Sequence, residues 1–577
     1  MGEMADFALD DVAEFENMRD LYHNGHLSAH ESLSYGFEDP TGAYTGFAGD
    51  SRDYTDVGSY ESLKSDIENG IISFGSSEEF LASCSSSPKK QRAIKKTNPE
   101  EDQNKIVEAS KYGNNIKIEA RAGCGKTTTL KKIAESNVKP SLYIAFNKNM
   151  AKEASEKFPS HVKCMTGHAL AYSMFGSVIS HKLSRPQGQY KNVAGTGSEV
   201  AKYYGLSPVF RNGKCVLTSA YLGLLAISTV SAFEYSKSKK IKRKHVPLAT
   251  LEKKVAEFEG VDIKDIVDKV FDTAKKLWED RKNPESIVLA SHDTYFKLFQ
   301  LSKPVLDYDA IYLDEAQDSN DAMMDIINRQ TCQVIMVGDS YQSIYGFRGA
   351  TSALDKFDAD EYVLNGSFRF GDLLANKATN LLSDDKGVFG LGSTSVNNAN
   401  DVDISVLGKD SCLIFRTNMA LVSTAIDIIS NGMNVDMPNT YDLRSAIDSA
   451  IELKNGNINK VKHSKLLQFS SWEEFESAKE DDQDLKSLYN MVSGDEKQLF
   501  RKLAVLNKND PSKAQITLRT AHGCKGLEWD TTVIMNDFSD DPATYEKDRQ
   551  ESNLMYVALT RAKNTCYYND VVDYIRC

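Results

Sequence analysis

The sequence predicts an α/β fold with two parallel-sheet cores, and three observations lead to this prediction. The chain has 577 residues and a hydrophobic content of 41%, which is enough for several packed domains. Short apolar strands alternate with helical stretches, first at 116–120, 142–146, 310–314 and 333–337 and again at 362–364, 412–415, 516–518 and 532–535. This alternation is typical of a parallel sheet covered by helices. Mostly helical stretches at 170–302 and 420–512 indicate one insertion in each core.

The formal net charge of −13 comes from the N-terminal segment. Residues 1–87 hold 18 acidic and 3 basic side chains, whereas the rest of the chain is nearly neutral, with 64 acidic and 66 basic side chains. The segment also carries eleven aromatic side chains, so it is not a plain solvating tail. The acidity is therefore a property of this extension and does not argue against an anionic ligand elsewhere.

The nine cysteines contain no CxxC pair, which argues against a zinc ribbon or a disulfide framework and favours a reducing compartment. We expect a soluble intracellular protein without membrane insertion, because the sequence has neither an opening signal segment nor an uninterrupted apolar run of about 18 residues.

The first strand, 116–120, leads into a glycine-containing segment with the spacing of a phosphate-binding loop. Residues 120–128 read Ala-Arg-Ala-Gly-Cys-Gly-Lys-Thr-Thr, with Ala in place of the usual leading Gly. Such a loop turns backbone N–H groups and Lys126 toward phosphates, and Thr127 can hold Mg²⁺. A helix starting there adds its dipole. The alternative is a glycine turn before a helix, but the preceding strand favours a nucleotide site.

Acidic residues end the strand at 310–314. Asp314 is the candidate second Mg²⁺ ligand, and Glu315 is the candidate base that orients the attacking water. Positive charge on the γ-phosphate could come from Arg369 and Arg561. The alternative is that these acids and arginines are solvated surface residues.

The order and spacing of these motifs resemble superfamily 1 DNA helicases of the UvrD/Rep type over residues 97–570. The segments 291–301, Ser-His-Asp-Thr-Tyr-Phe-Lys-Leu-Phe-Gln-Leu, and 365–371, Asn-Gly-Ser-Phe-Arg-Phe-Gly, are most similar to the F-box DNA helicase branch and its bacterial and viral relatives. We see no F-box. The resemblance implies two RecA-like P-loop parallel-sheet cores with mostly helical insertions.

The expected domains follow from this resemblance and from the strand pattern. They are an acidic N-terminal extension at 1–87, the first core at 88–170 and 301–360 with an insertion at 171–300, and the second core at 361–419 and 513–577 with an insertion at 420–512.

The resemblance implies a nucleotide site shared by the two cores. Its catalytic residues are Glu315, Gln342 as the γ-phosphate sensor, and the arginines Arg369 and Arg561. The expected nucleotide-binding residues are Gln103, which reads adenine, Phe368, which stacks on it, and Ala122, Gly123, Cys124, Gly125, Lys126, Thr127, Thr128, Gly526 and Glu528. Thr127 and Asp314 are the metal ligands.

The resemblance also implies a single-stranded DNA path lined by aromatic and polar residues. Stacking on aromatic rings tolerates any base sequence and contributes about 1 to 3 kcal/mol per base, which suits a motor that steps without reading sequence. The expected contacts are Phe146, Asn147, Thr166, His168, Tyr345, Phe347, Arg348, Thr417, Asn418 and His522.

The expected function is an ATP- and Mg²⁺-dependent helicase or translocase on single-stranded DNA and duplex junctions, with 3′-to-5′ polarity, in DNA replication, recombination or repair. It would be cytoplasmic in a bacterial or viral setting and nuclear in a eukaryote. The alternative is an ATP-switched DNA-binding regulator that remodels protein–DNA filaments without processive unwinding. RNA stays open as the strand.

The sequence does not assign a single role to three further features. Residues 1–87 could be disordered, could bind a replication or recombination protein, or could compete with DNA for its groove. The basic run 237–244 could contact duplex or be a solvated loop. His292 and Asp293 belong to the branch-specific segment 291–301, suggest no chemical role from the sequence, and are expected to have a structural one.

Overall fold

The computed structural model describes residues 96–183, 195–256, 258–346, 353–383, 386–438, 441–469, 471–479 and 483–575. The expectations for residues 1–87, and the predicted DNA contacts Phe347 and Arg348, lie outside these ranges. Among the helices of the described ranges, none is both long enough and apolar enough to cross a membrane.

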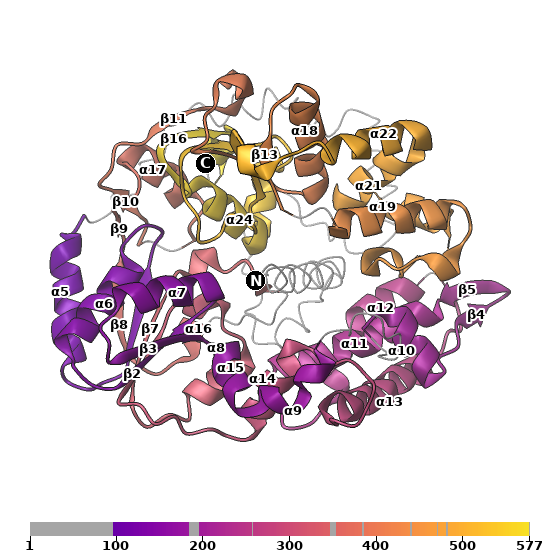
Figure 1. Ribbon diagram of the computed structural model, residues 1–577, viewed down its shortest axis with the longest axis horizontal. Coiled ribbons are helices and arrows are strands. Elements are labelled where there is room, and N and C mark those ends of the chain that lie inside the picture. Colours follow the sequence, from indigo (N-terminus) through magenta and orange to yellow (C-terminus); the bar gives the residue numbers. More distant parts are fainter. Residues whose placement is uncertain are drawn as a thin grey trace, which may run out of the picture. The chain divides into compact units, whose positions relative to one another are not determined.

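The first core contains a six-stranded parallel sheet in the order β3-β2-β6-β7-β1-β8 (Figure 1). Its strands are β1 (Ile116–Ala120), β2 (Ser141–Ala145), β3 (Val162–Thr166), β6 (Ala310–Leu313), β7 (Gln333–Gly338) and β8 (Asp360–Leu364). The central strands β2, β6 and β7 are buried along their whole length, as expected for a parallel sheet with both faces covered. Its helices are α5 (Pro99–Ser110), α6 (Lys126–Ser136), α7 (Lys148–Lys157), α8 (Gly167–Ala171), α14 (His292–Leu301), α15 (Asp321–Ile327) and α16 (Ala353–Lys356).

Strand β8 corrects one sequence-based assignment. Residues 362–364 were expected to open the second core, with a boundary at 361, but β8 pairs with β1 along Ile116–Ala120 and is the edge strand of the first sheet. The alternation of strands and helices in a sequence does not show to which sheet a strand belongs, and this assignment was wrong for that reason.

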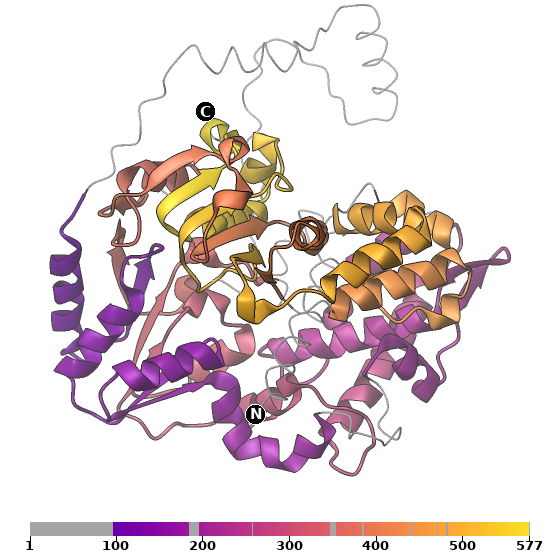
Figure 2. The same cartoon turned by 45° about the horizontal axis from the view of Figure 1, so that its top comes forward.

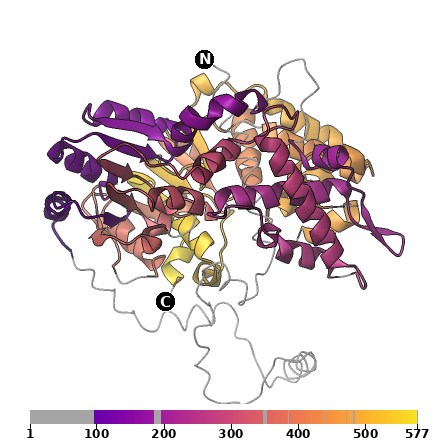
Figure 3. The same ribbon diagram turned by 90° about the horizontal axis from the view of Figure 1, so that it is seen from below.

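The first insertion is mostly helical, as predicted. It contains α10 (Gly197–Tyr204), α11 (Ser219–Tyr235), α12 (Leu248–Val255) and α13 (Ile263–Lys282), preceded by the short helical turns η1 (Tyr172–Gly176), α9 (Ser177–Ile179) and η2 (Ser180–Lys182). A small antiparallel hairpin of β4 (Val209–Arg211) and β5 (Lys214–Leu217) follows α10. Figure 3 shows the magenta helices of this insertion packed together, and α11 contacts both α10 and α13. Helices α10 and α11 approach so closely that a side chain at Gly223 would lie 2.0 Å from the carbonyl oxygen of Gly197.

The second core contains another six-stranded parallel sheet, in the order β11-β16-β15-β12-β14-β13. Its strands are β11 (Ser395–Asn398), β12 (Ser411–Phe415), β13 (Val435–Asp436), β14 (Ile516–Thr520), β15 (Trp529–Ile534) and β16 (Ala562–Tyr568). The short parallel pair β9 (Gly366–Ser367) and β10 (Phe389–Gly390) precedes it. Its helices are α17 (Asp372–Asn380), α18 (Asn418–Ser430), α23 (Pro542–Lys547), α24 (Arg549–Leu559) and α25 (Val571–Tyr574).

The second insertion begins later than the sequence analysis placed it. Helix α18 packs on β12 and β14, and β13 is a strand of the second sheet, so residues 420–436 belong to that core. The insertion proper contains α19 (Tyr441–Lys454), α20 (Trp472–Ala478), α21 (Gln483–Ser493) and α22 (Glu496–Leu506), drawn in orange in Figure 2. Apolar residues of α18, α19 and α21 share one hydrophobic cluster with the sheet.

Candidate functional site

The phosphate-binding loop connects β1 to α6, which begins at Lys126. Gly123 and Gly125 have positive φ angles of 75° and 80°, a conformation that side chains other than glycine rarely adopt. A Cβ atom at Gly123 would lie 2.4 Å from Ser367 Oγ, and one at Gly125 would lie 2.7 Å from Gln103 Nε2. Both backbone strain and lack of space therefore require glycine here, as the sequence predicted for a loop that presents its N–H groups.

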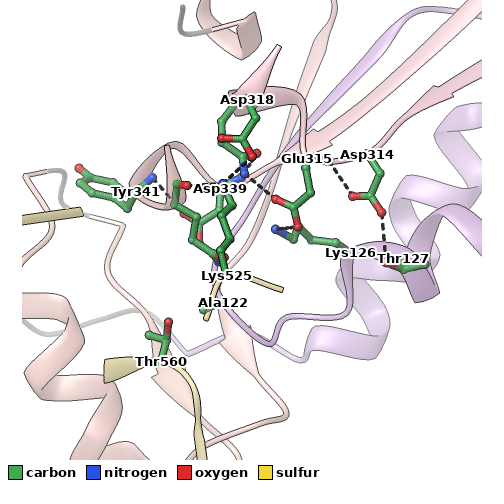
Figure 4. A network of polar contacts seen from close by, with 12 residues as sticks. Ala122, Lys126, Thr127, Asp314, Glu315, Asp318, Asp339, Tyr341, Lys525 and Thr560 are labelled. Carbon is green, nitrogen blue, oxygen red and sulfur yellow. Dashed lines mark hydrogen bonds and ion pairs between the residues drawn. The ribbon is translucent and has the colours of Figure 1, made fainter. Parts of the chain in front are cut away.

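The predicted metal and water residues lie together beside this loop (Figure 4). Thr127 Oγ1 donates to Asp314 Oδ2 at 3.2 Å, and the Tyr143 hydroxyl donates to the same oxygen at 2.5 Å. Lys126 Nζ lies 2.8 Å from Glu315 Oε1. Glu315 has a φ of 50° and its N–H donates to Asp314 Oδ1. A hydroxyl and a carboxylate in contact are oxygen donors of the kind that Mg²⁺ prefers.

The two carboxylates have different electrostatic surroundings. Burial raises the pKa of Asp314, and the neighbouring Glu315 charge raises it further. Burial also opposes ionisation of Glu315, but the attraction of Lys126 and Lys525 outweighs it and lowers the pKa of Glu315 to about 2. Glu315 is therefore held as an anion by two lysines, one from each core.

These residues fit a nucleotide triphosphate with Mg²⁺. The glycines of the loop adopt the positive φ angles that such a loop needs, Lys126 supplies a buried cation, and Thr127 with Asp314 supplies hard oxygen ligands. When bound, Mg²⁺ would neutralise phosphate charge at this pair.

Residues of the segment 366–369 pack directly on the loop. The Phe368 N–H donates to the Gly123 carbonyl at 2.9 Å. Arg369 Nε donates to Glu528 Oε2 at 2.9 Å, and its Nη1 donates to the Thr560 carbonyl at 2.8 Å. Phe368 is half exposed, and its ring lies 3.8 Å from the position of a Cβ atom at Gly125. The ring is thus free to stack on a base held beside the loop.

Gln103 lies on α5, and its side chain approaches Gly125, as the Phe368 ring does. Its Nε2 donates to the Cys124 carbonyl at 3.5 Å, and its Oε1 accepts from Lys132 Nζ at 2.8 Å. The structure therefore brings Gln103 and Phe368 to the same side of the loop, as an adenine site would need. The predicted residue Gly526 has a φ of 79° and open space around it, and Thr128 is exposed on α6.

Arg561 and Gln342 are in direct contact across the two cores. Arg561 Nη2 donates to Gln342 Oε1 at 3.2 Å, and its Nε donates to the Val557 carbonyl at 2.8 Å. Burial lowers the pKa of Arg561 to about 10, and the nearby Arg369 charge acts in the same direction. The two predicted arginines thus lie close together, where an incoming anion would relieve their mutual repulsion.

Asp339 and Tyr556, which the sequence analysis did not select, extend this contact by further hydrogen bonds. Asp339 Oδ2 accepts from Gln342 Nε2 at 2.7 Å and from the Tyr556 hydroxyl at 3.1 Å. The same hydroxyl accepts from the Ala122 N–H of the phosphate-binding loop at 3.1 Å. Both residues lie near predicted site residues in the sequence, Gln342 and Arg561, but only the fold shows that Tyr556, in α24, reaches the loop.

Lys525 is the third residue that sequence reasoning missed. Its Nζ donates to Asp318 Oδ2 and to the Gln342 carbonyl, each at 2.5 Å, and it lies 5.0 Å from the centre of the Tyr345 ring. Burial raises the pKa of Asp318 to about 6, with Lys525 opposing the increase. Lys525 therefore contacts the nucleotide-sensing segment and an aromatic residue of the predicted DNA path.

Two aromatic residues of the predicted DNA path lie against each other. The rings of Phe146 and Tyr345 are stacked, with centroids 5.3 Å apart and planes 17° from parallel. The Tyr345 hydroxyl donates to the His522 carbonyl at 3.4 Å. Three of the predicted DNA contacts thus come together from both cores.

Other predicted DNA contacts lie at helix starts. Asn147 caps α7 by accepting from the Met150 N–H, and Thr166 caps α8 by accepting from the Ala169 N–H. His168 is half exposed on α8. Helix starts present N–H groups that suit phosphate oxygens, so these positions remain consistent with the predicted phosphate contacts.

Thr417 and Asn418 begin α18 after β12. Thr417 is buried, and its hydroxyl accepts from the Ala420 N–H and donates to Asp537 Oδ2. The Thr417 side chain is therefore occupied by contacts within the core. A DNA contact at this loop would depend on Asn418 or on the backbone.

Cys124 and Cys524 are buried fillers of their loops. Burial raises the pKa of both thiols, that of Cys524 to about 11. In the basic run 237–244, Arg243 pairs with Asp268 at 2.5 Å and lies over the Phe271 ring.

Two protein-family models match different parts of this chain. Residues 103–348 match an AAA domain, and residues 417–569 match the UvrD-like helicase C-terminal domain. F-box DNA helicase 1 of Gallus gallus is 30% identical over 510 residues, which are 80% of this chain and 48% of that protein. F-box DNA helicase protein 1 of Schizosaccharomyces pombe is 31% identical over 520 residues, which are 82% of this chain and 57% of that protein. The chain thus spans about half the length of these curated relatives.

The matched segments divide the site as the geometry does. The first contains Lys126, Asp314, Glu315 and Gln342, and the second contains Lys525 and Arg561. Two of the contacts that join these residues, Lys525 to the Gln342 carbonyl and Arg561 to Gln342 Oε1, connect the two matched segments. The chain belongs to the UvrD-like superfamily 1 helicases.

Proposed function

We propose that this chain is an ATP-dependent DNA helicase that moves along single-stranded DNA and separates duplex, with 3′-to-5′ polarity, in DNA replication, recombination or repair. The observation that carries the proposal is the position of Lys525. This one side chain contacts the nucleotide-sensing segment through the Gln342 carbonyl and lies over the Tyr345 ring of the stacked pair. A movement of the γ-phosphate sensor would therefore be transmitted through Lys525 to the base-stacking residues.

The first core would bind the nucleotide. Lys126 and the loop N–H groups would hold the phosphates, Thr127 and Asp314 would hold Mg²⁺, and Glu315 would orient the attacking water. Gln103 and Phe368 would hold the adenine. The chemistry needs positioned charge more than covalent assistance, and these residues supply it.

The second core would complete the site. Arg369 and Arg561 carry the positive charge that stabilises the γ-phosphate in the transition state, and Gln342 lies between Arg561 and Asp339. Because both arginines come from outside the first sheet, nucleotide binding would draw the cores together and product release would let them part. Repeated closure and opening would move a strand held on the Phe146 and Tyr345 rings.

The nucleotide assignment is tested with Lys126→Ala. We expect DNA-stimulated ATP hydrolysis to fall by about 10³-fold, since a buried cation on the phosphates is removed. Lys131→Ala on the same helix, where Lys131 pairs with Glu135 at the surface, is the matched control. Hydrolysis that survived Lys126→Ala would refute the assignment.

Strand separation is tested with fluorescent forked duplexes, with and without ATP, and with substrates carrying only a 3′ or only a 5′ single strand. Separation of the 3′-tailed substrate alone would support the proposal. Hydrolysis and filament removal without separation would instead identify an ATP-switched regulator. RNA of the same sequence, tested for ATPase stimulation, identifies the strand.

A further inference from the structure

The segment 291–301, which had no role in the sequence analysis, forms α14 between the first core and the first insertion. Ser291 caps the helix by accepting from the Thr294 N–H at 3.3 Å. Three polar side chains on its buried face bond to neighbouring elements. Thr294 donates to Glu234 of α11 at 2.8 Å, Lys297 donates to the Ser236 carbonyl at 2.5 Å, and Gln300 donates to Asp325 of α15 at 2.6 Å. These bonds fix the position of α14, because leaving a buried polar group without a hydrogen-bond partner lowers the stability of the fold.

Asp293, in the first turn of α14, is held from two sides. Its Oδ1 lies 3.0 Å from His168 Nε2, and its Oδ2 accepts from the Tyr235 hydroxyl at 3.2 Å. The Asp293 side chain is 14% exposed, whereas that of His168 is 46% exposed. The His168 ring also packs on the Phe296 ring, with centroids 4.9 Å apart. A fixed carboxylate thus orients an accessible imidazole.

The direction of this hydrogen bond constrains what His168 can do. A carboxylate and a phosphate oxygen both only accept, so an imidazole that bonds to both must donate from both ring nitrogens. That requires a proton on each ring nitrogen, with Nε2–H directed at Asp293 and Nδ1–H left for the phosphate. Without Asp293, the ring could rotate away from this orientation.

We propose that Asp293 is a positioning residue that orients His168 for contact with a phosphate of the single strand. The proposal rests on the proposed function, in which His168 lies on the DNA path. It gives the branch-specific segment 291–301 a role: α14 carries the carboxylate, and its buried bonds to α11 and α15 fix where that carboxylate stands.

The test is Asp293→Asn, with binding of a single-stranded oligonucleotide measured against salt concentration. Removal of a negative charge should by itself strengthen DNA binding. The proposal predicts the opposite, a weakening of about three- to ten-fold, because a partly exposed charge-assisted contact is lost. The slope of log affinity against log salt should fall by about 0.7, the value for one phosphate contact on a single strand. Asp268→Asn, at the exposed pair with Arg243, is the charge-matched control and should not weaken binding.

Two further measurements separate positioning from general damage. In DNA-stimulated hydrolysis, Asp293→Asn should raise the DNA concentration for half-maximal rate and leave the rate at saturating DNA within about two-fold, as expected for loss of binding alone. In a His168→Ala background, Asp293→Asn should have no more effect than Asp268→Asn, because the two residues act as one unit.

Each result has a distinct meaning. If His168→Ala weakens binding but Asp293→Asn does not, the positioning role is wrong while the DNA path stands. If neither variant affects binding although DNA stimulates hydrolysis, His168 is not a phosphate contact and the inference fails alone. If the unaltered chain shows no DNA-stimulated hydrolysis, the proposed function itself fails.

Discussion

The two cores have the same strand, loop and helix at the carboxyl edge of their sheets, but the two loops are built differently. In the first core, β1 leads through Gly123 and Gly125 into α6, and both glycines have positive φ angles. In the second core, β12 leads through Arg416 and Thr417 into α18. There the Asp537 carboxylate accepts from the N–H groups of both residues, at 2.9 and 2.8 Å, and from Thr417 Oγ1 at 3.1 Å.

The second loop thus already holds an anion of its own. Burial raises the pKa of Asp537, but its bonds to the Arg416 and Thr417 N–H groups oppose the increase. Backbone N–H groups buried at a strand end must find a partner, and in the second core a permanent carboxylate is that partner. A repeated architecture therefore need not repeat a site: in the proposed function one core binds the nucleotide, and the other contributes arginines to it.

The largest expected effect comes from removing what the second core contributes. Arg561→Ala should lower DNA-stimulated kcat by about 10³-fold, as for other arginines that reach the γ-phosphate from outside the loop, and leave binding of a fluorescent ATP analogue nearly unchanged. Arg549→Ala, on α24 and over the Tyr341 ring, is the control. Loss of nucleotide binding in Arg561→Ala would mean that the first core does not bind alone, and the proposed division would be incorrect.

An intermediate effect is expected from the anion of the second loop. Asp537→Ala leaves two N–H groups and a hydroxyl without their acceptor, so it should lower the free energy of unfolding by about 2 to 3 kcal/mol. Urea unfolding measures this change, and Asp540→Ala, at an exposed acid that accepts a hydrogen bond from Asn569, should have little effect. Nucleotide affinity should stay the same. A change in nucleotide affinity larger than the change in stability would show that the second loop belongs to the site.

The smallest effect is expected from a hydrogen bond that connects the two cores. Tyr556→Phe removes one oxygen, which joins the Ala122 N–H to Asp339, and should reduce kcat/KM for ATP by about ten-fold, since one buried N–H loses its acceptor. Tyr545→Phe is the matched control, because the Tyr545 hydroxyl bonds to Ser539 within the second core. Equal activities of the two variants would show that this inter-core bond does not support hydrolysis.

Local patterns in the sequence were enough for the first core's own residues. The strand 116–120 was predicted with its observed bounds, and the glycine-containing loop follows it as predicted, although the positive φ angles and close packing of the glycines came only from the structure. Thr127, Asp314, Lys126 and Glu315 lie together as expected, because the carboxyl ends of parallel strands meet at one edge of a sheet. The strand 360–364 was assigned to the wrong sheet, since its neighbours are chosen by packing and not by its own residues.

Local sequence patterns were thus sufficient to predict the phosphate-binding loop, the strand ends that carry the acids and the arginines available to complete the site. Which distant groups touch became known only from the packing of the chain. Lys525 bonds to Asp318 across 207 positions, Arg561 to Gln342 across 219, and His168 to Asp293 across 125. The physical reason is range: backbone conformation and strand ends are set by neighbouring residues, whereas these pairs depend on how two sheets and an inserted helix pack together.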